Sequence, residues 1–226
     1  MSSILEAPNP PVSSHDEAPV SPRTLEDLVQ QLGGIPLSRV RLIPAIGQAS
    51  ESDLLASTHR LCELAQGTVL EKGMGFFESV LASVLVHLFR CWPLCRKTGF
   101  VVGDGGYTRL RPGLVRVPDV AFFTWDRIGS RTAPRDPICK SVPNLAVEIV
   151  SASNTRAEMD LKRAEYFQAG VEVVWFVYPE TITVEVWSTP RDCHISGIND
   201  TLDCTPFAPG LTISIREWFD LASEGE

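Results

Sequence analysis

Residues 144–178 read NLAVEIVSASNTRAEMDLKRAEYFQAGVEVVWFVY, and this stretch decides the fold. Its two ends are runs of apolar and β-branched residues, which are typical of buried strands. Between them, Thr155 and Glu158 form a capping-box pattern and Gly170 a C-terminal cap, so we expect a helix from Thr155 to about Ala169. A helix between two buried strands indicates a crossover connection. The sequence therefore predicts an α/β (α+β) fold in which helices flank a mixed sheet.

The same periodicities predict the other elements. Upstream we expect short helices at 24–33 and 51–60, a short strand at 68–72, a long amphipathic helix at 75–92, and two strands, 99–110 and 114–124, joined by a turn near Pro112. Downstream we expect a strand at 181–187 and a short strand and helix at 213–223. The expected organisation is a disordered tail (1–22), an N-terminal helical extension (23–66) and a main domain (67–226).

Composition and charge narrow the class of protein. No apolar run approaches the roughly 18 residues of a membrane span, and residues 1–14 lack a secretory pattern, so a cytoplasmic protein is expected. The net charge of −8 argues against a nucleic-acid partner. However, residues 96–140 contain nine basic and four acidic side chains, a local charge of +5. This basic region suits a polyanion, although chance clustering of charge is an alternative.

Three carboxylates lie at positions where the pattern predicts burial. Glu148 shares a strand side with Ala146 and Val150, Asp119 lies in a similar apolar row, and Glu78 falls inside the apolar stripe of the long helix. Burying an ionised carboxylate costs several kcal/mol unless a partner compensates. A divalent cation such as Mg²⁺ or Mn²⁺ would relieve the repulsion among them, and a structural salt bridge is the alternative. If repulsion dominates, Glu148→Gln should raise the melting temperature of the metal-free protein.

A lysine on the second predicted helix is a candidate partner for these acids. Lys162 is flanked on its helix face by Met159 and Tyr166, so it could point inward, although an ordinary surface lysine would also fit. A helix that crosses back over the sheet would bring this side chain over the strand of Glu148. We therefore expect the Lys162 ammonium to lie within roughly 6 Å of an Asp119 or Glu148 carboxylate oxygen.

These residues resemble a known family. Pro118-Asp119 followed by Glu148-Ile149-Val150 is similar to the PD-(D/E)XK nuclease superfamily. The runs PDVAFFTWDRI and PNLAVEIVSASNTRAEMDLKRAEYFQAGVEVVWFVYP, with RLCELAQGTVLEKGMGFFESVLASVL upstream, are similar to the Uma-type family of putative restriction endonucleases. The resemblance covers about residues 24–220 and implies a restriction-endonuclease-like core of helix, three strands, helix and strand.

The resemblance also implies residue roles. Asp119 and Glu148 would bind Mg²⁺ or Mn²⁺, with Glu78 completing the metal site. The superfamily lysine position is occupied by Val150, and Lys162 on the following helix would replace that lysine. Tyr178-Pro179 departs from the family's usual Asp-Pro.

The leading hypothesis is a metal-dependent endonuclease acting on DNA, with Asp119, Glu148, Lys162 and Glu78 as catalytic residues. Basic residues of the 125–142 loop could contact phosphates: Arg127, Arg131, Arg135 and Lys140. The alternatives are a catalytically silent binding or assembly module and a metal-dependent hydrolase with another substrate. No membrane partner is expected, and a homodimer stays open.

Overall fold

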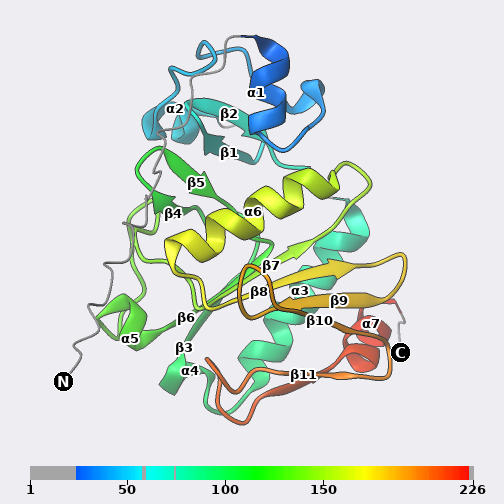
Figure 1. Ribbon diagram of the computed structural model, residues 1–226. Helices are drawn as coiled ribbons and strands as arrows, with labels where there is room; N and C mark the ends of the chain where they lie inside the picture. Colours follow the sequence, from blue (N-terminus) through cyan, green and yellow to red (C-terminus); the bar gives the residue numbers. More distant parts are fainter. Residues whose placement is uncertain (1–23, 58–59, 74, 224–226) are drawn as a thin grey trace, which may run out of the picture.

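The computed structural model describes residues 24–57, 60–73 and 75–223, and the predicted tail at 1–22 lies outside them. Its centre is a six-stranded sheet with the strand order β10-β9-β8-β7-β6-β3 (Figure 1). Its strands in chain order are β3 (Gly99–Val102), β6 (Val120–Thr124), β7 (Leu145–Ile149), β8 (Val173–Tyr178), β9 (Thr183–Trp187) and β10 (Cys193–Ser196). The β7–β8 pair is parallel and the other neighbours are antiparallel. The predicted mixed sheet is confirmed.

Helix α6 (Arg156–Ala169) is the crossover between β7 and β8, as the sequence predicts. Thr155 Oγ1 accepts a hydrogen bond from the backbone N–H of Glu158 at the start of the helix. Gly170 ends it in the left-handed conformation, with φ of 96°. Local sequence therefore sets both ends of α6.

The two faces of the six-stranded sheet carry separate hydrophobic cores. Leu145, Val147 and Ile149 of β7 pack with the long helix α3 (Phe76–Cys91) and the C-terminal helix α7 (Ile215–Ser223). Ala146, on the other face of β7, packs with α6 and α1 (Leu25–Gln31). Strand β7 is therefore covered on both faces, which confirms its predicted central position.

A second, four-stranded sheet with the order β2-β1-β5-β4 lies beside α6, in the upper part of Figure 1. Its strands are β1 (Cys62–Ala65), β2 (Thr68–Glu71), β4 (Thr108–Arg111) and β5 (Leu114–Arg116). The remaining elements are η1 (Leu37–Arg39), α2 (Glu51–Ala56), α4 (Cys95–Thr98), α5 (Trp125–Ile128), β11 (Thr201–Asp203) and β12 (Thr212–Ser214). The expected boundary between residues 66 and 67 falls at the turn of the β1–β2 hairpin, so the N-terminal extension shares this sheet with the main domain.

The structure corrects one prediction about residues 99–124. Instead of one pair of strands joined near Pro112, the segment forms four strands divided between the two sheets: β4 pairs with β5, and β3 pairs with β6. Glycines at 103, 105 and 106 interrupt the first predicted strand, and Gly105 has φ of 90°. Pro118 interrupts the second, because it has no N–H to donate to a ladder. As a result, Asp119 lies where the chain passes from the small sheet to the large one.

Candidate active site

The carboxylates of Asp119 and Glu148 come together between the two sheets. Asp119 directly precedes β6, which pairs with β7 through Val120 and Val147. The backbone N–H of Asp119 donates to the carbonyl of Val147 at 2.9 Å, and Asp119 Oδ2 accepts from the N–H of Ile149 at 2.6 Å. Asp119 and Glu148 are only 2% and 3% exposed. The β6–β7 register therefore holds both acids in place and excludes water from them.

Lys162 of α6 points into this site, as the sequence predicts. Its Nζ lies 3.0 Å from Glu148 Oε2 and 3.3 Å from Glu63 Oε1, and its side chain is 1% exposed. Tyr166, one helical turn later, donates its hydroxyl hydrogen to Glu148 Oε1 at 2.5 Å. Both oxygens of Glu148 thus have partners on α6.

A second lysine, which the sequence analysis did not single out, lies between the two acids. Lys72 follows β2, and its Nζ is 2.7 Å from Asp119 Oδ1 and 3.8 Å from Glu148 Oε2. The same ammonium group donates to the carbonyl of Val117. Lys72 is the nearest cation to Asp119 among the printed ion pairs of the described residues, whereas Lys162 pairs with Glu148 and Glu63.

Three further charged residues extend the cluster into the small sheet and along α6. Arg116 of β5 donates to Glu63 Oε2 at 2.8 Å and to Glu165 Oε2 at 2.8 Å. Glu63 Oε1 also accepts from the N–H of Val117 at 3.1 Å. The rule that found Glu148, a charge within a short apolar strand, would also have found Glu63 in CELA and Arg116 in LVRV. Lys72 gives no comparable signal, because a lysine just after a strand is usually solvated.

Burial and neighbouring charges shift the proton affinities in the cluster. Burial raises the pKa of Asp119 to about 6, against the opposing effect of Lys72. Burial alone would raise the pKa of Glu63 as well, but Lys162, Arg116 and Lys72 together hold it well below its usual range. Burial and the nearby Glu148 carboxylate raise the pKa of Tyr166 well above its ordinary value, so its hydroxyl keeps its proton and remains a donor.

Glu78 lies apart from this cluster. It is in the first turn of α3, and its carboxylate folds back towards Gly75, where a β-carbon would lie 2.1 Å from Oε2. The body of α3 packs on the sheet face opposite the one that Glu148 shares with Ala146. In residues 24–57, 60–73 and 75–223, no three His, Cys, Asp or Glu side chains are placed to hold a metal ion together. A role for Glu78 as a third ligand stays a prediction.

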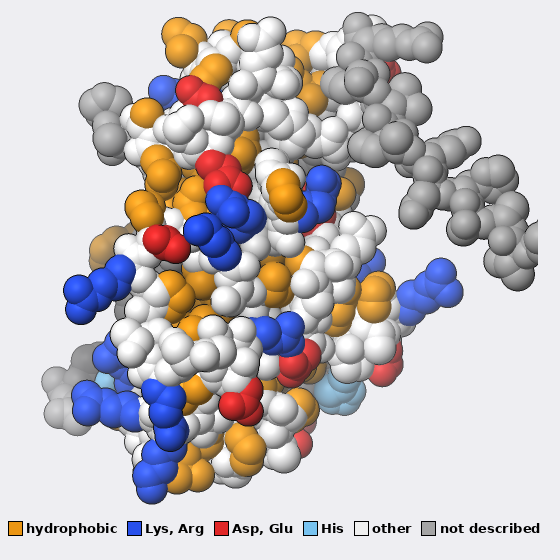
Figure 2. Space-filling model, turned by 90° about the vertical axis from the view of Figure 1, so that its left-hand side faces the viewer, with side chains coloured by type: hydrophobic (Ala, Val, Ile, Leu, Met, Phe, Trp, Pro, Cys, Tyr) orange, Lys and Arg blue, Asp and Glu red, His pale blue; other side chains and the backbone are white. Residues whose placement is uncertain are grey.

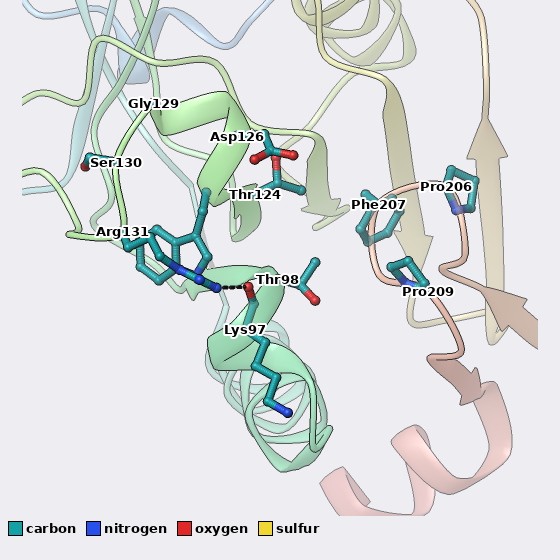
Figure 3. A pocket seen from close by; sticks show the side chains of 11 residues that line it. Lys97, Thr98, Thr124, Asp126, Gly129, Ser130, Arg131, Pro206, Phe207 and Pro209 are labelled. Atoms are coloured by element: carbon teal, nitrogen blue, oxygen red, sulfur yellow. Dashed lines mark hydrogen bonds between the residues drawn. The ribbon is translucent and has the colours of Figure 1, made fainter.

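The basic loop residues lie at the other end of β6, near a cavity of about 700 Å³ (Figure 3). Arg131 lines this cavity and donates to the carbonyl of Lys97, which lies on the opposite wall. Arg127 instead pairs with Glu172, and Lys140 lies 3.5 Å from Asp136. Arg135 is exposed. The loop therefore offers Arg131 and Arg135 as basic groups without a printed ion-pair partner, among the residues that the structure describes.

Comparisons with other proteins agree with this geometry. The chain is similar to the crystal structure of a putative nuclease belonging to DUF820 from Anabaena variabilis ATCC 29413, with a TM-score of 0.63 and 19% sequence identity. The match covers 73% of this chain and 93% of that one. At this identity the likeness establishes the fold alone. Among proteins with curated descriptions, none is significantly similar.

A family model described as Uma2, putative restriction endonuclease, matches residues 52–216, a range that contains Glu63, Lys72, Asp119, Glu148 and Lys162. The match extends over well more than half of the chain, and the fold and the order of these charged residues agree with it. The chain belongs to the Uma2 family of putative restriction endonucleases.

Proposed function

We propose that the chain is a metal-dependent endonuclease that hydrolyses phosphodiester bonds in DNA. The observation that carries this proposal is the pair Asp119 and Glu148, two buried carboxylates held side by side on β6 and β7. Such a pair costs several kcal/mol to bury, and a fold needs no such arrangement for its stability alone. Perturbed carboxylates next to specific charge partners are the usual marker of a functional site.

The donor set fits a hard divalent cation. The Lys72 ammonium already bridges both carboxylates, which shows that one cation can be shared between Asp119 Oδ1 and Glu148 Oε2. Carboxylate oxygens are the ligands that Mg²⁺ and Mn²⁺ prefer. When bound, such an ion would supply Lewis-acid activation of water and of the scissile phosphate.

The chain's own residues would prepare this reaction. Asp119 is oriented by the N–H of Ile149, and Glu148 by Tyr166 and Lys162, so neither acid needs to reorganise before it binds. Lys162 would fix Glu148 and place positive charge near the phosphate. The basic side chains at the other end of β6 would hold the nucleic-acid backbone without reading its sequence.

The test is a cleavage assay on plasmid and on single-stranded DNA with Mg²⁺, with Mn²⁺ and with excess EDTA. We expect cleavage only with a divalent ion, and its loss in Asp119→Ala and Glu148→Ala. Asp160→Asn, an exposed carboxylate on α6 with 42% of its side chain accessible, is the matched control and should cleave normally. Cleavage that persists in EDTA would refute the metal mechanism.

A second candidate function has its own observation. Four carboxylates of the cluster face three cations, and Asp119 and Glu148 are almost inaccessible. A site so nearly neutralised by its own side chains also suits a catalytically silent nuclease-fold module that binds or assembles. A folded protein that binds DNA but cleaves none of the substrates with either metal would favour this alternative.

A further inference from the structure

The position of Lys72 bears directly on how a metal would enter the site. Its ammonium lies 2.7 Å from Asp119 Oδ1 and 3.8 Å from Glu148 Oε2, with 3% of the side chain exposed. These are the two oxygens that point at a shared cation. Lys72 therefore occupies the place between the acids that a bound metal would take.

An ammonium group and a divalent ion cannot both hold that place. Magnesium binds oxygen at about 2.0–2.1 Å and demands near-octahedral geometry, which leaves no room for a lysine bridging the same atoms. Two cations so close in a poorly solvated site would also repel each other strongly. Lys162 avoids this conflict, because it approaches Glu148 from α6 and shares it with Glu63.

Lys72 also has a route out of the site. The residue as a whole is only half-buried even though its side chain is enclosed, so its backbone is near solvent. The next residue, Gly73, approaches Ser153 so closely that a β-carbon there would lie 2.3 Å from the serine hydroxyl oxygen. A small rotation of the lysine side chain would thus bring the ammonium out beside the 151–154 turn.

We propose that Lys72 is the resident counter-ion of the Asp119–Glu148 pair and that a divalent cation binds by displacing its ammonium group. The inference rests on the proposed function, because it takes these two carboxylates as the metal site. It assigns Lys72 and Lys162 different roles. Lys72 competes with the metal, and Lys162 stays in place as the fixed partner of Glu148.

Amine labelling of the full-length protein, read by mass spectrometry, tests the displacement directly and needs neither substrate nor variant. Without divalent ions, Lys72 and Lys162 should both be protected. Saturating Mg²⁺ should raise the labelling of Lys72 several-fold and leave Lys162 unchanged. Exposed Lys140, 64% accessible, is the internal standard for reagent activity.

Calorimetric titration of Mg²⁺ into variants supplies the second measurement. Lys72→Met should bind Mg²⁺ at least about tenfold more tightly than the wild type, because a competing charge is removed from the binding position itself. Lys162→Met should gain less, because Lys72 still bridges the acids. Binding that appears only in Lys72→Met would support the proposal in its strongest form.

Two results would overturn the inference, and they differ in what they say about the function. If Mg²⁺ binds to the wild type while Lys72 stays protected and Lys72→Met binds no more tightly, the metal site stands and the displacement is wrong. If neither protein binds Mg²⁺ or Mn²⁺, the carboxylate pair is not a metal site, and the proposed function falls with the inference.

Discussion

At the scale of single residues, Glu148 is held by attraction. Its oxygens lie 2.5 Å from the Tyr166 hydroxyl and 3.0 Å from the Lys162 ammonium. Repulsion between acids underlies the sequence-based expectation that Glu148→Gln would stabilise the metal-free protein. The contacts reverse that expectation, because removing one member of a buried ion pair leaves the other without a counter-charge.

We therefore expect Glu148→Gln to lower the free energy of unfolding by about 3 kcal/mol in the absence of metal. Glu172→Gln, which removes a half-exposed partner of Arg127, should cost less than about 1 kcal/mol. Urea denaturation monitored by tryptophan fluorescence measures both. Adding Lys162→Met to Glu148→Gln should recover part of the loss, and a double variant no more stable than the single one would argue against the ion pair.

The proton affinity of Glu63 gives a prediction about pH. Lys162, Arg116 and Lys72 hold its pKa far below the unfolded value despite the effect of burial. A group with a depressed folded-state pKa stabilises the protein above its unfolded pKa, and this stability is lost as the pH falls below about 4.5. The melting temperature should therefore decrease between pH 5 and pH 3.

Glu63→Gln tests this linkage. The variant should melt lower than the wild type at pH 7, because Arg116 and Lys162 lose a partner, and its melting temperature should depend less on pH between 5 and 3. Calorimetry across this range gives both slopes. Equal slopes for the two proteins would assign the acid sensitivity to other carboxylates, such as Glu158.

At the scale of elements, α6 joins the N-terminal segment to the sheet. Arg39 of η1 makes two hydrogen bonds of 2.8 Å with the Glu158 carboxylate, and Thr155 Oγ1 donates to the carbonyl of Gly33 at 2.6 Å. Gly33 has φ of 80°, and a β-carbon there would lie 2.5 Å from the Glu158 α-carbon. Only glycine allows this approach. The helix that carries Lys162 is thus fixed from both sides.

We expect Arg39→Ala to destabilise the protein by about 3–5 kcal/mol, because Glu158 keeps its charge in a buried position. Hydrogen exchange should show a larger loss of protection in 25–40 and at the start of α6 than in β8. Arg41→Ala, in which a 45%-exposed arginine leaves Glu71, is the control and should cost less than about 1 kcal/mol. Uniform loss of protection would instead indicate that the arginine supports the whole domain equally.

At the scale of the whole molecule, the acidic cluster and the basic cavity lie at opposite ends of β6, roughly 16 Å apart for a five-residue strand. Figure 2 shows Lys and Arg side chains gathered in the lower part of one face, at the height of α4 in Figure 1, while the chain as a whole carries −8. No helix among the described residues is long and apolar enough to cross a membrane.

This charge separation predicts where DNA would be held. Replacing Lys97 and Arg131 by Ala should weaken DNA binding and reduce the slope of log K against log salt by up to about 0.9 per lost phosphate contact. Replacing Arg127 and Lys140 should change it less, because acidic side chains already pair with both. Fluorescence anisotropy at several salt concentrations measures the slopes. Equal slopes for both double variants would place the phosphates elsewhere.

The sequence by itself determined the β7–α6–β8 unit, the burial of Glu148 and the inward direction of Lys162. These features follow from local rules: strand alternation, helix periodicity and the caps at Thr155 and Gly170. They lie within 35 consecutive residues, so their placement depends little on the rest of the chain.

Only the tertiary structure decided which charges complete the cluster. Glu63 and Lys72 come from the β1–β2 hairpin and Arg116 from β5, and the pairing of β1 with β5 brings them to Asp119. The break at Pro118 turns Asp119 out of the small sheet and against β7. Nothing in TVLEK separates a buried lysine from a solvated one, because the difference lies in partners 47 and 76 residues further along the chain. The charge balance of the site is therefore a property of the sheet register.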